Sequence, residues 1–280
     1  MQSEAVSMKR IKAVVVIGAF IVFLLFSGIL GYKFIQNEIS QNKKISELQN
    51  DIVFLKTELK EQNNSTRVNY SDTAFNYVAI GNSITKHVIS DYWWNEIGMA
   101  ATSQDKDYVH LISSYLEDLH GEVCMNAVNF SVWEMQATDR AETYQLIDHY
   151  LDKRLDLVTI QLSENVNDMT TYEKDYEELI NYIHKCAPNA QIIVIDDFWS
   201  GDDKSTLKEK AANNTGADFV SLSLIKGKPE YQCGIGTTVY DTGGREHIVK
   251  HDGVAAHPGD KGMKYIADAV ISVIMGKTEQ

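Results

Sequence analysis

The chain has 280 residues, which is enough for one large domain and an additional segment. Its formal net charge of −13 argues against a nucleic-acid partner, because proteins that bind nucleic acid neutralise phosphates with basic side chains. The three cysteines, Cys124, Cys186 and Cys233, have no ligand-like spacing, which argues against a zinc site and a disulfide framework and leaves a single bridge open.

Residues 13–32, AVVVIGAFIVFLLFSGILGY, form an uncharged apolar stretch. A helix of about twenty such residues crosses the hydrocarbon core of a bilayer. Lys9, Arg10 and Lys12 precede it, and this basic flank favours a cytoplasmic N-terminus. A cleavable signal peptide is the alternative, but its apolar core is shorter and ends in a small-residue cleavage site. We therefore expect a cytoplasmic tail over residues 1–12 and a single-pass signal-anchor helix over 13–32, with the remainder outside a bacterial cell.

Residues 33–62 have the pattern of a charged helix. Apolar side chains recur three and four residues apart at Ile45, Leu48, Ile52, Leu55 and Leu59. This spacing indicates a heptad seam, so one interpretation is a short coiled coil with weak self-association through residues 45–59. A solvated helical stalk is the other, because only about two heptads are clear. The polar residues 63–72 are expected to link this helix to a domain over residues 73–280.

From about residue 73 the sequence alternates apolar strands with amphipathic helices. The expected strands cover residues 75–82, 123–131, 155–163, 190–199 and 217–225. The expected helices cover residues 106–121, 134–153, 171–188, 202–214 and 259–275. Such alternation is typical of an α/β fold with a parallel sheet covered on both faces. Residues 237–249, TTVYDTGGREHIV, interrupt it and predict a β-hairpin.

Four polar segments follow the expected strands or precede the last helix. Ser83 follows the first strand, NFSVWE the second and QLSENVND the third, and HDGVAAHPGDKGM precedes the closing helix. Because a parallel sheet brings the carboxyl ends of its strands to one edge, we expect these segments to meet there. They supply a serine, a histidine, an acid and an amide. Acyl transfer needs that set as nucleophile, base, orienting acid and oxyanion donor.

With these segments in that order, residues 74–275 resemble the SGNH hydrolases, the GDSL family of esterases and lipases. The segment GNSIT resembles the family's first block and implies that Ser83 is the nucleophile, with its own backbone N–H as an oxyanion donor. LSENV is similar to the third block and implies that Asn165 is the side-chain oxyanion donor, and HPGDKGM implies that His257 is the general base. The resemblance also implies a flavodoxin-like three-layer α/β/α sandwich that uses no metal and no organic cofactor.

The second and third blocks depart from the family pattern. The second normally contains a glycine whose backbone N–H is an oxyanion donor, and here that position falls at Trp133 or Glu134. We take Glu134 as this donor, because any residue except proline retains a backbone N–H. In the third block, Ser163 stands where glycine is usual and Val166 where aspartate is usual.

The acid that orients the histidine is also displaced. The family acid sits three residues before the histidine, where this chain has Val254, whereas Asp252 lies five residues before it. We assign the role to Asp252, because the role depends on geometry rather than on position. The alternative is a Ser–His dyad whose imidazole is oriented by a backbone carbonyl.

Further side chains near the expected site are candidates for substrate contact. Trp93, Trp94 and Trp133 are assigned to a wall of the site, because an aromatic face packs well against a sugar ring. Packing at the edge of the core is the alternative for the first two. Glu164 adjoins Asn165 and is assigned a contact with a polar substrate, with a solvated loop acid as the alternative.

Together these features predict a membrane-anchored esterase that removes a short acyl group, such as acetyl, from cell-envelope carbohydrate. Two other functions remain open. The same acyl-enzyme serves an O-acetyltransferase whose acceptor is a sugar hydroxyl, and a tethered binding or scaffold domain without catalysis is the third candidate.

Overall fold

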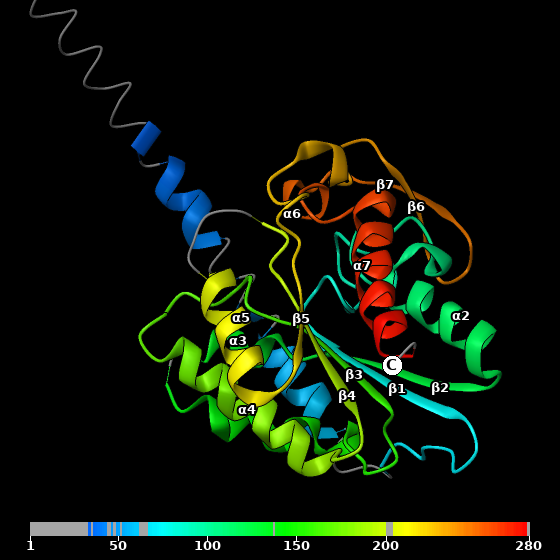
Figure 1. Ribbon diagram of the computed structural model, residues 1–280. Coiled ribbons are helices and arrows are strands. Elements are labelled where there is room, and N and C mark those ends of the chain that lie inside the picture. Colours follow the sequence, from blue (N-terminus) through cyan, green and yellow to red (C-terminus); the bar gives the residue numbers. More distant parts are fainter. Residues whose placement is uncertain are drawn as a thin grey trace, which may run out of the picture. The chain divides into compact units, whose positions relative to one another are not determined.

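The computed structural model describes residues 33–61, except 35, 44, 45, 47, 48 and 51, together with residues 67–136, 138–199 and 204–278 (Figure 1). The chain divides into two compact units, Met1–Val53 and Phe54–Gln280. The expected membrane span over residues 13–32 lies outside the described residues. Among those that are described, no helix has the length and apolar character needed to cross a bilayer.

The expected stalk helix ends inside the second unit. Residues 52–61 are helical, and Leu55 and Leu59 are buried in a hydrophobic cluster of that unit. Ile45 and Leu48, two other positions of the expected seam, lie outside the described residues. Because Leu55 and Leu59 already pack within their own chain, they are not available to a second copy. The compact unit therefore includes residues that the sequence placed in a stalk.

The second unit is built on a five-stranded parallel sheet (Figure 1). The strands are β1 (Phe75–Gly81), β2 (Val123–Asn129), β3 (Leu157–Gln161), β4 (Gln191–Ile195) and β5 (Asp218–Val220). Their order is β2-β1-β3-β4-β5, with every neighbouring pair parallel. All five strands were expected from apolar runs, and the α/β prediction is confirmed.

Helices cover both faces of the sheet, as Figure 1 shows. The helices of one face are α2 (Tyr108–His120) and α7 (Asp260–Thr278), and those of the other are α3 (Ser131–Met135), α4 (Tyr172–Cys186) and α5 (Lys204–Thr215). Side chains alternate between the two cores along β1: Tyr77 and Ala79 join the α2/α7 core, whereas Val78 and Ile80 join the α4/α5 core. This three-layer arrangement is consistent with the flavodoxin-like fold that the resemblance implied.

One expected helix is interrupted. Residues 134–153 were expected to form a single helix, but α3 ends at Met135 and a 3₁₀ helix, η2, runs from Arg140 to Tyr150. Asp139 between them has a left-handed backbone conformation with φ of 52°, which a continuous helix does not allow. Arg140 turns inward there, is buried, and bonds to the Asp175 carboxylate. This buried ion pair favours the break.

The remaining elements lie in the connections between these strands and helices. They are η1 (Gln104–Lys106), η3 (Pro229–Tyr231), β6 (Thr238–Tyr240), β7 (Glu246–Ile248) and α6 (Asp252–Ala255). Strands β6 and β7 pair antiparallel, which confirms the expected hairpin. Its turn is closed by the Asp241 carboxylate, which accepts hydrogen bonds from the backbone N–H groups of Gly243 and Arg245.

Candidate active site

The turn after β1 is shaped by Gly81. A Cβ atom at this position would lie 1.8 Å from the Thr85 Oγ1 and 2.8 Å from the Gln161 carbonyl oxygen, so only glycine fits. The close approach lets the chain leave the sheet at once, and Ser83 follows two residues later at the carboxyl edge. This explains why a buried strand delivers a serine to a tight turn.

Asn82 fixes the turn through its side-chain amide. It is fully buried, and its Oδ1 accepts a hydrogen bond of 3.0 Å from the Ile84 backbone N–H. Its Nδ2 donates to Glu134 Oε1 at 3.0 Å and to Glu164 Oε2 at 2.8 Å. Both amide hydrogens are thus committed to protein carboxylates. Asn82 holds the backbone that carries Ser83 and has no hydrogen left for a substrate.

Ser83 and His257 meet as the sequence predicted. The Ser83 Oγ lies 2.8 Å from the His257 Nε2, across 174 residues of chain. The Trp199 ring packs perpendicular to the imidazole, with 4.9 Å between the ring centroids. Its Nε1 donates a hydrogen bond of 2.9 Å to the Ala256 carbonyl oxygen, which holds the indole in place. The histidine is buried and the serine is half-buried, so the hydroxyl is open to a ligand while the base is shielded.

The group that orients His257 is a backbone carbonyl. Its Nδ1 lies 2.6 Å from the Gly253 carbonyl oxygen. Because a carbonyl only accepts, the proton sits on Nδ1, and Nε2 is left to accept the Ser83 proton. Asp252 is exposed at the start of α6, and no hydrogen bond joins it to the imidazole in the described structure. The assignment of the orienting role to Asp252 is therefore wrong, and the geometry is that of the dyad alternative.

Replacing Asp252 by asparagine is expected to leave turnover of a small ester within about twofold of wild type, because exposed substitutions away from a site change little. Steady-state hydrolysis of p-nitrophenyl acetate by both proteins measures this. A loss of a hundredfold or more in a folded variant would show that the carboxylate does reach the imidazole during catalysis.

The environment of His257 keeps it neutral. Burial lowers the pKa of His257 to about 4, and the nearby imidazoles of His87 and His251 act in the same direction. The hydrogen bond to the Gly253 carbonyl opposes the shift, because it favours the protonated ring. At neutral pH the imidazole is therefore unprotonated and able to accept a proton, as a general base must be.

The pH dependence of kcat/KM is expected to follow from this shift. Protonation of His257 removes the base, so activity falls as pH drops through its pKa of about 4 and not through the ordinary histidine value near 6.5. Initial rates measured on the acid side, with intrinsic fluorescence to confirm folding at each pH, test the expectation. An acidic limb centred near pH 7 would contradict it, because it would indicate a carboxylate partner for the ring.

Two N–H groups at the carboxyl edge of the sheet are free to bind an oxyanion. The Ser83 backbone N–H has no hydrogen-bond partner in the described part of the chain. The Asn165 Nδ2 donates one hydrogen to Glu134 Oε2 at 2.6 Å, and its second hydrogen has no partner among the described residues. Asn165 follows β3, the neighbour of β1, so both groups come from adjacent strand ends. These are two of the three donors that the resemblance implied.

The backbone N–H of Glu134 stays a predicted oxyanion donor, and its side chain has contacts that the sequence did not predict. The carboxylate is 1% exposed and accepts hydrogen bonds from Asn82, Asn165 and the Ser163 backbone N–H. The neighbouring Trp133 N–H, the other candidate, donates to the Phe130 carbonyl within the α3 turn. The segment NFSVWE therefore places the buried carboxylate of Glu134 within hydrogen-bond distance of Asn165, one of the two free oxyanion donors.

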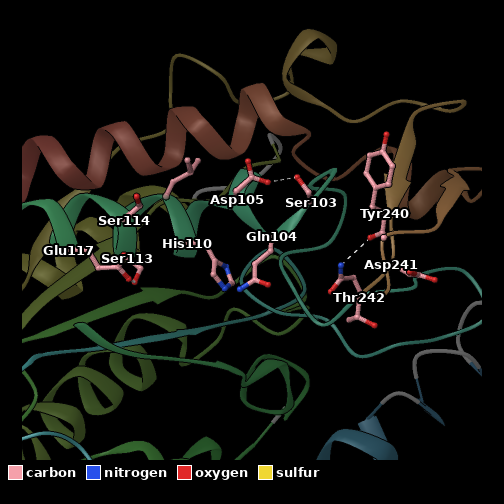
Figure 2. A pocket seen from close by; sticks show the side chains of 13 residues that line it. Ser103, Gln104, Asp105, His110, Ser113, Ser114, Glu117, Tyr240, Asp241 and Thr242 are labelled. Atoms are coloured by element: carbon pink, nitrogen blue, oxygen red, sulfur yellow. Dashed lines mark hydrogen bonds between the residues drawn. The ribbon is translucent and has the colours of Figure 1, made fainter. Parts of the chain in front are cut away.

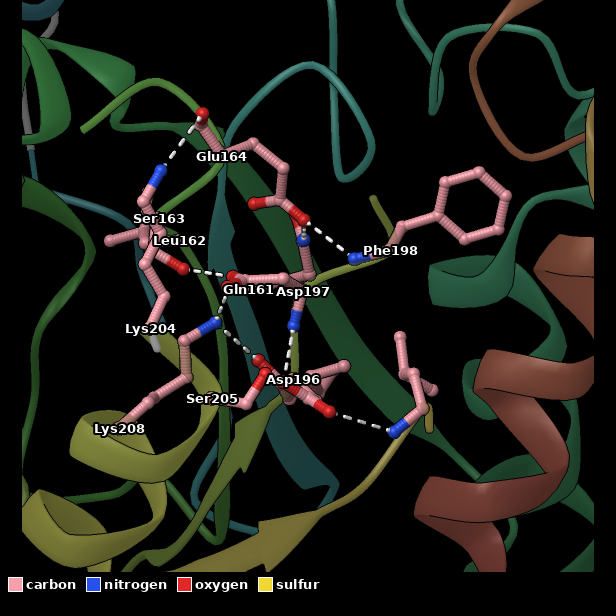
Figure 3. A network of polar contacts seen from close by, with 12 residues as sticks. Gln161, Leu162, Ser163, Glu164, Asp196, Asp197, Phe198, Lys204, Ser205 and Lys208 are labelled. Atoms are coloured by element: carbon pink, nitrogen blue, oxygen red, sulfur yellow. Dashed lines mark hydrogen bonds and ion pairs between the residues drawn. The ribbon is translucent and has the colours of Figure 1, made fainter. Parts of the chain in front are cut away.

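A polar network continues behind this carboxylate (Figure 3). Glu164 accepts hydrogen bonds from the Gln161 side chain at 2.8 Å and the Phe198 backbone at 3.0 Å. Burial and the Asp197 charge raise the pKa of Glu164 to about 7. Asp197 in turn pairs with the buried Lys208 Nζ at 2.7 Å.

The backbone at Ser163 shows why glycine is usual in the third block. Its φ of 137° lies in a region that side chains disfavour. Two contacts hold it there: its N–H donates to Glu134 and its hydroxyl donates to Asp197. The sequence departure from glycine is thus accommodated by the same network.

Two of the three tryptophans that were expected to contact substrate lie in the interior of the protein. Trp93 and Trp133 are buried in the two hydrophobic cores, and the structure contradicts their assignment to substrate contact. Trp94 is half-buried and stacks on His247 with ring centroids 4.4 Å apart. It lines a cavity of about 480 Å³, together with a second stacked pair, Tyr92 and His251.

Glu164 also differs from its expected role. Both of its carboxylate oxygens are engaged by protein donors, so the structure gives it a place in the network and no free oxygen for a substrate.

A larger cavity of about 640 Å³ lies beside α2 and the β6–β7 hairpin (Figure 2). Its lining includes His110, Glu117 and Asp241 and excludes Ser83 and His257, so it is separate from the dyad.

Sequence reasoning missed the role of Asn82 and the Asp197–Lys208 pair, and it did not identify the Gly253 carbonyl as the one that orients His257. Asn82 had a signal, because an amide residue stands directly before the serine in the turn. The Gly253 carbonyl had none, since every residue carries one. The described residues also contain no group of His, Cys, Asp and Glu side chains arranged to hold a metal ion.

No protein-family model matches the sequence, and no curated protein matches it. Solved structures do show the same fold. A two-domain esterase active on acetylated mannans, co-crystallised with mannopentaose, is 16% identical with a TM-score of 0.50, over 74% of this chain and 50% of that one. This chain thus spans about half the length of that esterase.

Two further solved structures have TM-scores below that of the mannan esterase. A phospholipase A1 from Streptomyces albidoflavus is 12% identical with a TM-score of 0.42, over 71% of this chain and 99% of that one. A protein from Parabacteroides merdae described as a GDSL-like lipase is 15% identical with a TM-score of 0.44, over 72% and 96% of the two chains.

Proposed function

We propose that this protein is a serine hydrolase of the SGNH type that cleaves short acyl esters through an acyl-enzyme on Ser83. The observation that carries the proposal is the hydrogen bond between the Ser83 Oγ and the unprotonated Nε2 of a buried His257, whose other nitrogen is fixed by the Gly253 carbonyl. A buried neutral histidine on a half-exposed serine hydroxyl is the arrangement that activates a nucleophile.

The reaction follows from these contacts. As the Ser83 Oγ attacks the ester carbonyl carbon, its proton passes to the His257 Nε2, and negative charge develops on the carbonyl oxygen. The Ser83 N–H and the free Asn165 N–H stabilise that charge. The imidazolium then protonates the leaving alcohol as the ester C–O bond breaks. Water repeats the sequence on the acyl-enzyme, with His257 taking a proton from water and returning it to Ser83.

We assign the substrate to acylated carbohydrate, with acetyl as the acyl group. The cavity that includes Tyr92 and Trp94 offers aromatic surface of the kind that packs against sugar rings. Neither Ser83 nor His257 lines it, but His251 does, and that imidazole is close enough to His257 to influence its charge. The fold shared with an esterase active on acetylated mannans supports the same class.

Mass spectrometry of the protein after exposure to a fluorophosphonate tests the proposal. One covalent adduct on Ser83, together with acetate release from acetylated oligosaccharides, is expected. Adduct formation with acyl release only after addition of a sugar acceptor would identify an O-acetyltransferase instead. Failure to label or to hydrolyse any small ester, with retained glycan binding, would favour a scaffold domain.

The cellular location remains part of the proposal. Residues 13–32 anchor the chain in a bacterial membrane, and the domain that carries Ser83 faces outward, where acylated envelope glycans lie. Protease treatment of whole cells tests this, and protection of the C-terminal domain in intact cells would overturn it.

A further inference from the structure

Glu134 is a buried acidic residue on α3, next in the chain to Val132 and Trp133 of one hydrophobic cluster. It is 1% exposed, and no lysine or arginine forms an ion pair with it in the described structure. Its contacts are N–H groups: the Asn82 and Asn165 amides and the Ser163 backbone. A buried carboxylate without a cation is costly, and burial raises the pKa of Glu134. Stability alone therefore gives little reason for an acid here.

The contacts of Glu134 converge on the groups that flank the nucleophile. One oxygen accepts from Asn82, whose Oδ1 fixes the Ile84 N–H immediately after Ser83. The other oxygen accepts from the Asn165 Nδ2. A single carboxylate thus connects the turn that carries the serine to the side chain proposed as oxyanion donor.

The chemistry of an amide explains what this connection does. The oxygen and nitrogen ends of an asparagine side chain have nearly the same shape, so packing alone does not select one orientation. An ionised carboxylate accepts hydrogen bonds and donates none. It therefore holds the nitrogen end of Asn165 toward Glu134, and the second hydrogen on that nitrogen points elsewhere. The flipped amide would present its oxygen to a developing oxyanion and would repel it.

We infer that Glu134 is a positioning residue, which orients the Asn165 amide so that its free N–H faces the oxyanion formed at Ser83. This inference rests on the proposed hydrolase function. Glu134 does not touch substrate and acts through Asn165, whereas its bond to Asn82 belongs to the structure of the turn.

Glu134→Gln is the variant that separates this role from packing, because glutamine has nearly the same shape but presents one donor where the carboxylate presents an acceptor. We expect kcat to fall about 10²-fold, as for loss of one oxyanion donor, with KM within about threefold. In an Asn165→Ala background the same substitution should cost about threefold or less, because the group through which it acts is already gone. Glu142→Gln, at an exposed glutamate, is the matched control.

Equal losses in the two backgrounds would overturn the inference, as would unchanged kcat in a folded Glu134→Gln protein. If wild type itself neither labels nor hydrolyses, the proposed function fails instead.

A measurement on the wild type covers the case in which the variant does not fold. In side-chain amide NMR spectra, assigned with Asn165→Ala, one Asn165 hydrogen should be shifted downfield by the Glu134 carboxylate in the free protein. A boronic acid adduct on Ser83 should move the second hydrogen and leave the first. Asn165 hydrogens that both resonate at the shifts of a solvent-exposed asparagine amide in the free protein would refute the contact, whether or not the protein is an esterase.

Discussion

Replacing Ser83 by alanine is expected to abolish both the hydrolysis of p-nitrophenyl acetate and the covalent adduct with a fluorophosphonate. The Oγ atom forms the bond to the acyl group, so no acyl-enzyme exists without it. Loss of a triad serine in other hydrolases costs roughly 10⁶-fold in kcat, because base and donors then have no nucleophile to assist. The His257 Nε2 loses its partner at 2.8 Å, but the Gly253 carbonyl still holds the ring.

The adduct is measured by intact-protein mass and the rate by initial velocities corrected for the spontaneous reaction. Ser114→Ala is a suitable control, because Ser114 is an exposed serine on α2, outside the dyad. An adduct of unchanged stoichiometry on the Ser83→Ala protein would show that another side chain is the nucleophile, and the assignment of the site would fail.

The sheet could be predicted from sequence because its strands are buried on both faces. Strand β1 and strand β3 read as nearly continuous apolar runs, and their residues are buried throughout or almost throughout. The helices α2 and α4 carry apolar side chains at helical spacing and were placed within a few residues of their bounds. Local patterns were sufficient here, since each element buries a face that its own periodicity defines.

The predictions of a continuous helix over residues 134–153 and of substrate contacts by Trp93 and Trp133 were wrong for a different reason. The break at Asp139 depends on the ion pair between Arg140 and Asp175, which are far apart in sequence. Trp93 and Trp133 lie on segments next to the site, but the direction of each ring is set by the core that it fills. Neither fact has a signature in a local pattern.

Within the site, the sequence indicated which residues arrive at the edge of the sheet but not what each side chain bonds to. Ser83, Asn165 and His257 occupy motif positions at strand or helix ends, and topology then brings the segments together. The sequence left a backbone carbonyl open as the group that orients the imidazole but did not identify which one, and the α6 turn places the Gly253 carbonyl, not the Asp252 carboxylate, on Nδ1. A backbone carbonyl is present at every position, so only the fold can select one.

Replacing His257 by alanine is expected to reduce kcat by at least about 10⁴-fold, with the fluorophosphonate reaction slowed to a similar degree. The serine hydroxyl keeps its place but has no acceptor for its proton, and attack then requires an alkoxide that is scarce at neutral pH. The wild-type imidazolium is stabilised by the Gly253 carbonyl and by no carboxylate in the described structure. We therefore expect His257 to be the general base without help from an acid.

His120→Gln controls for the loss of an imidazole, because His120 is exposed at the end of α2 and stacks on Phe75 at the start of β1, the opposite edge of the sheet. Added imidazole should restore part of the lost rate in the alanine variant, since the substitution leaves a space beside Trp199 where the ring stood. Retention of more than a tenth of wild-type activity without added imidazole would mean that another group takes the Ser83 proton. The neighbouring imidazoles of His87 and His251 would then be the next to replace, because both are close enough to influence the charge on His257.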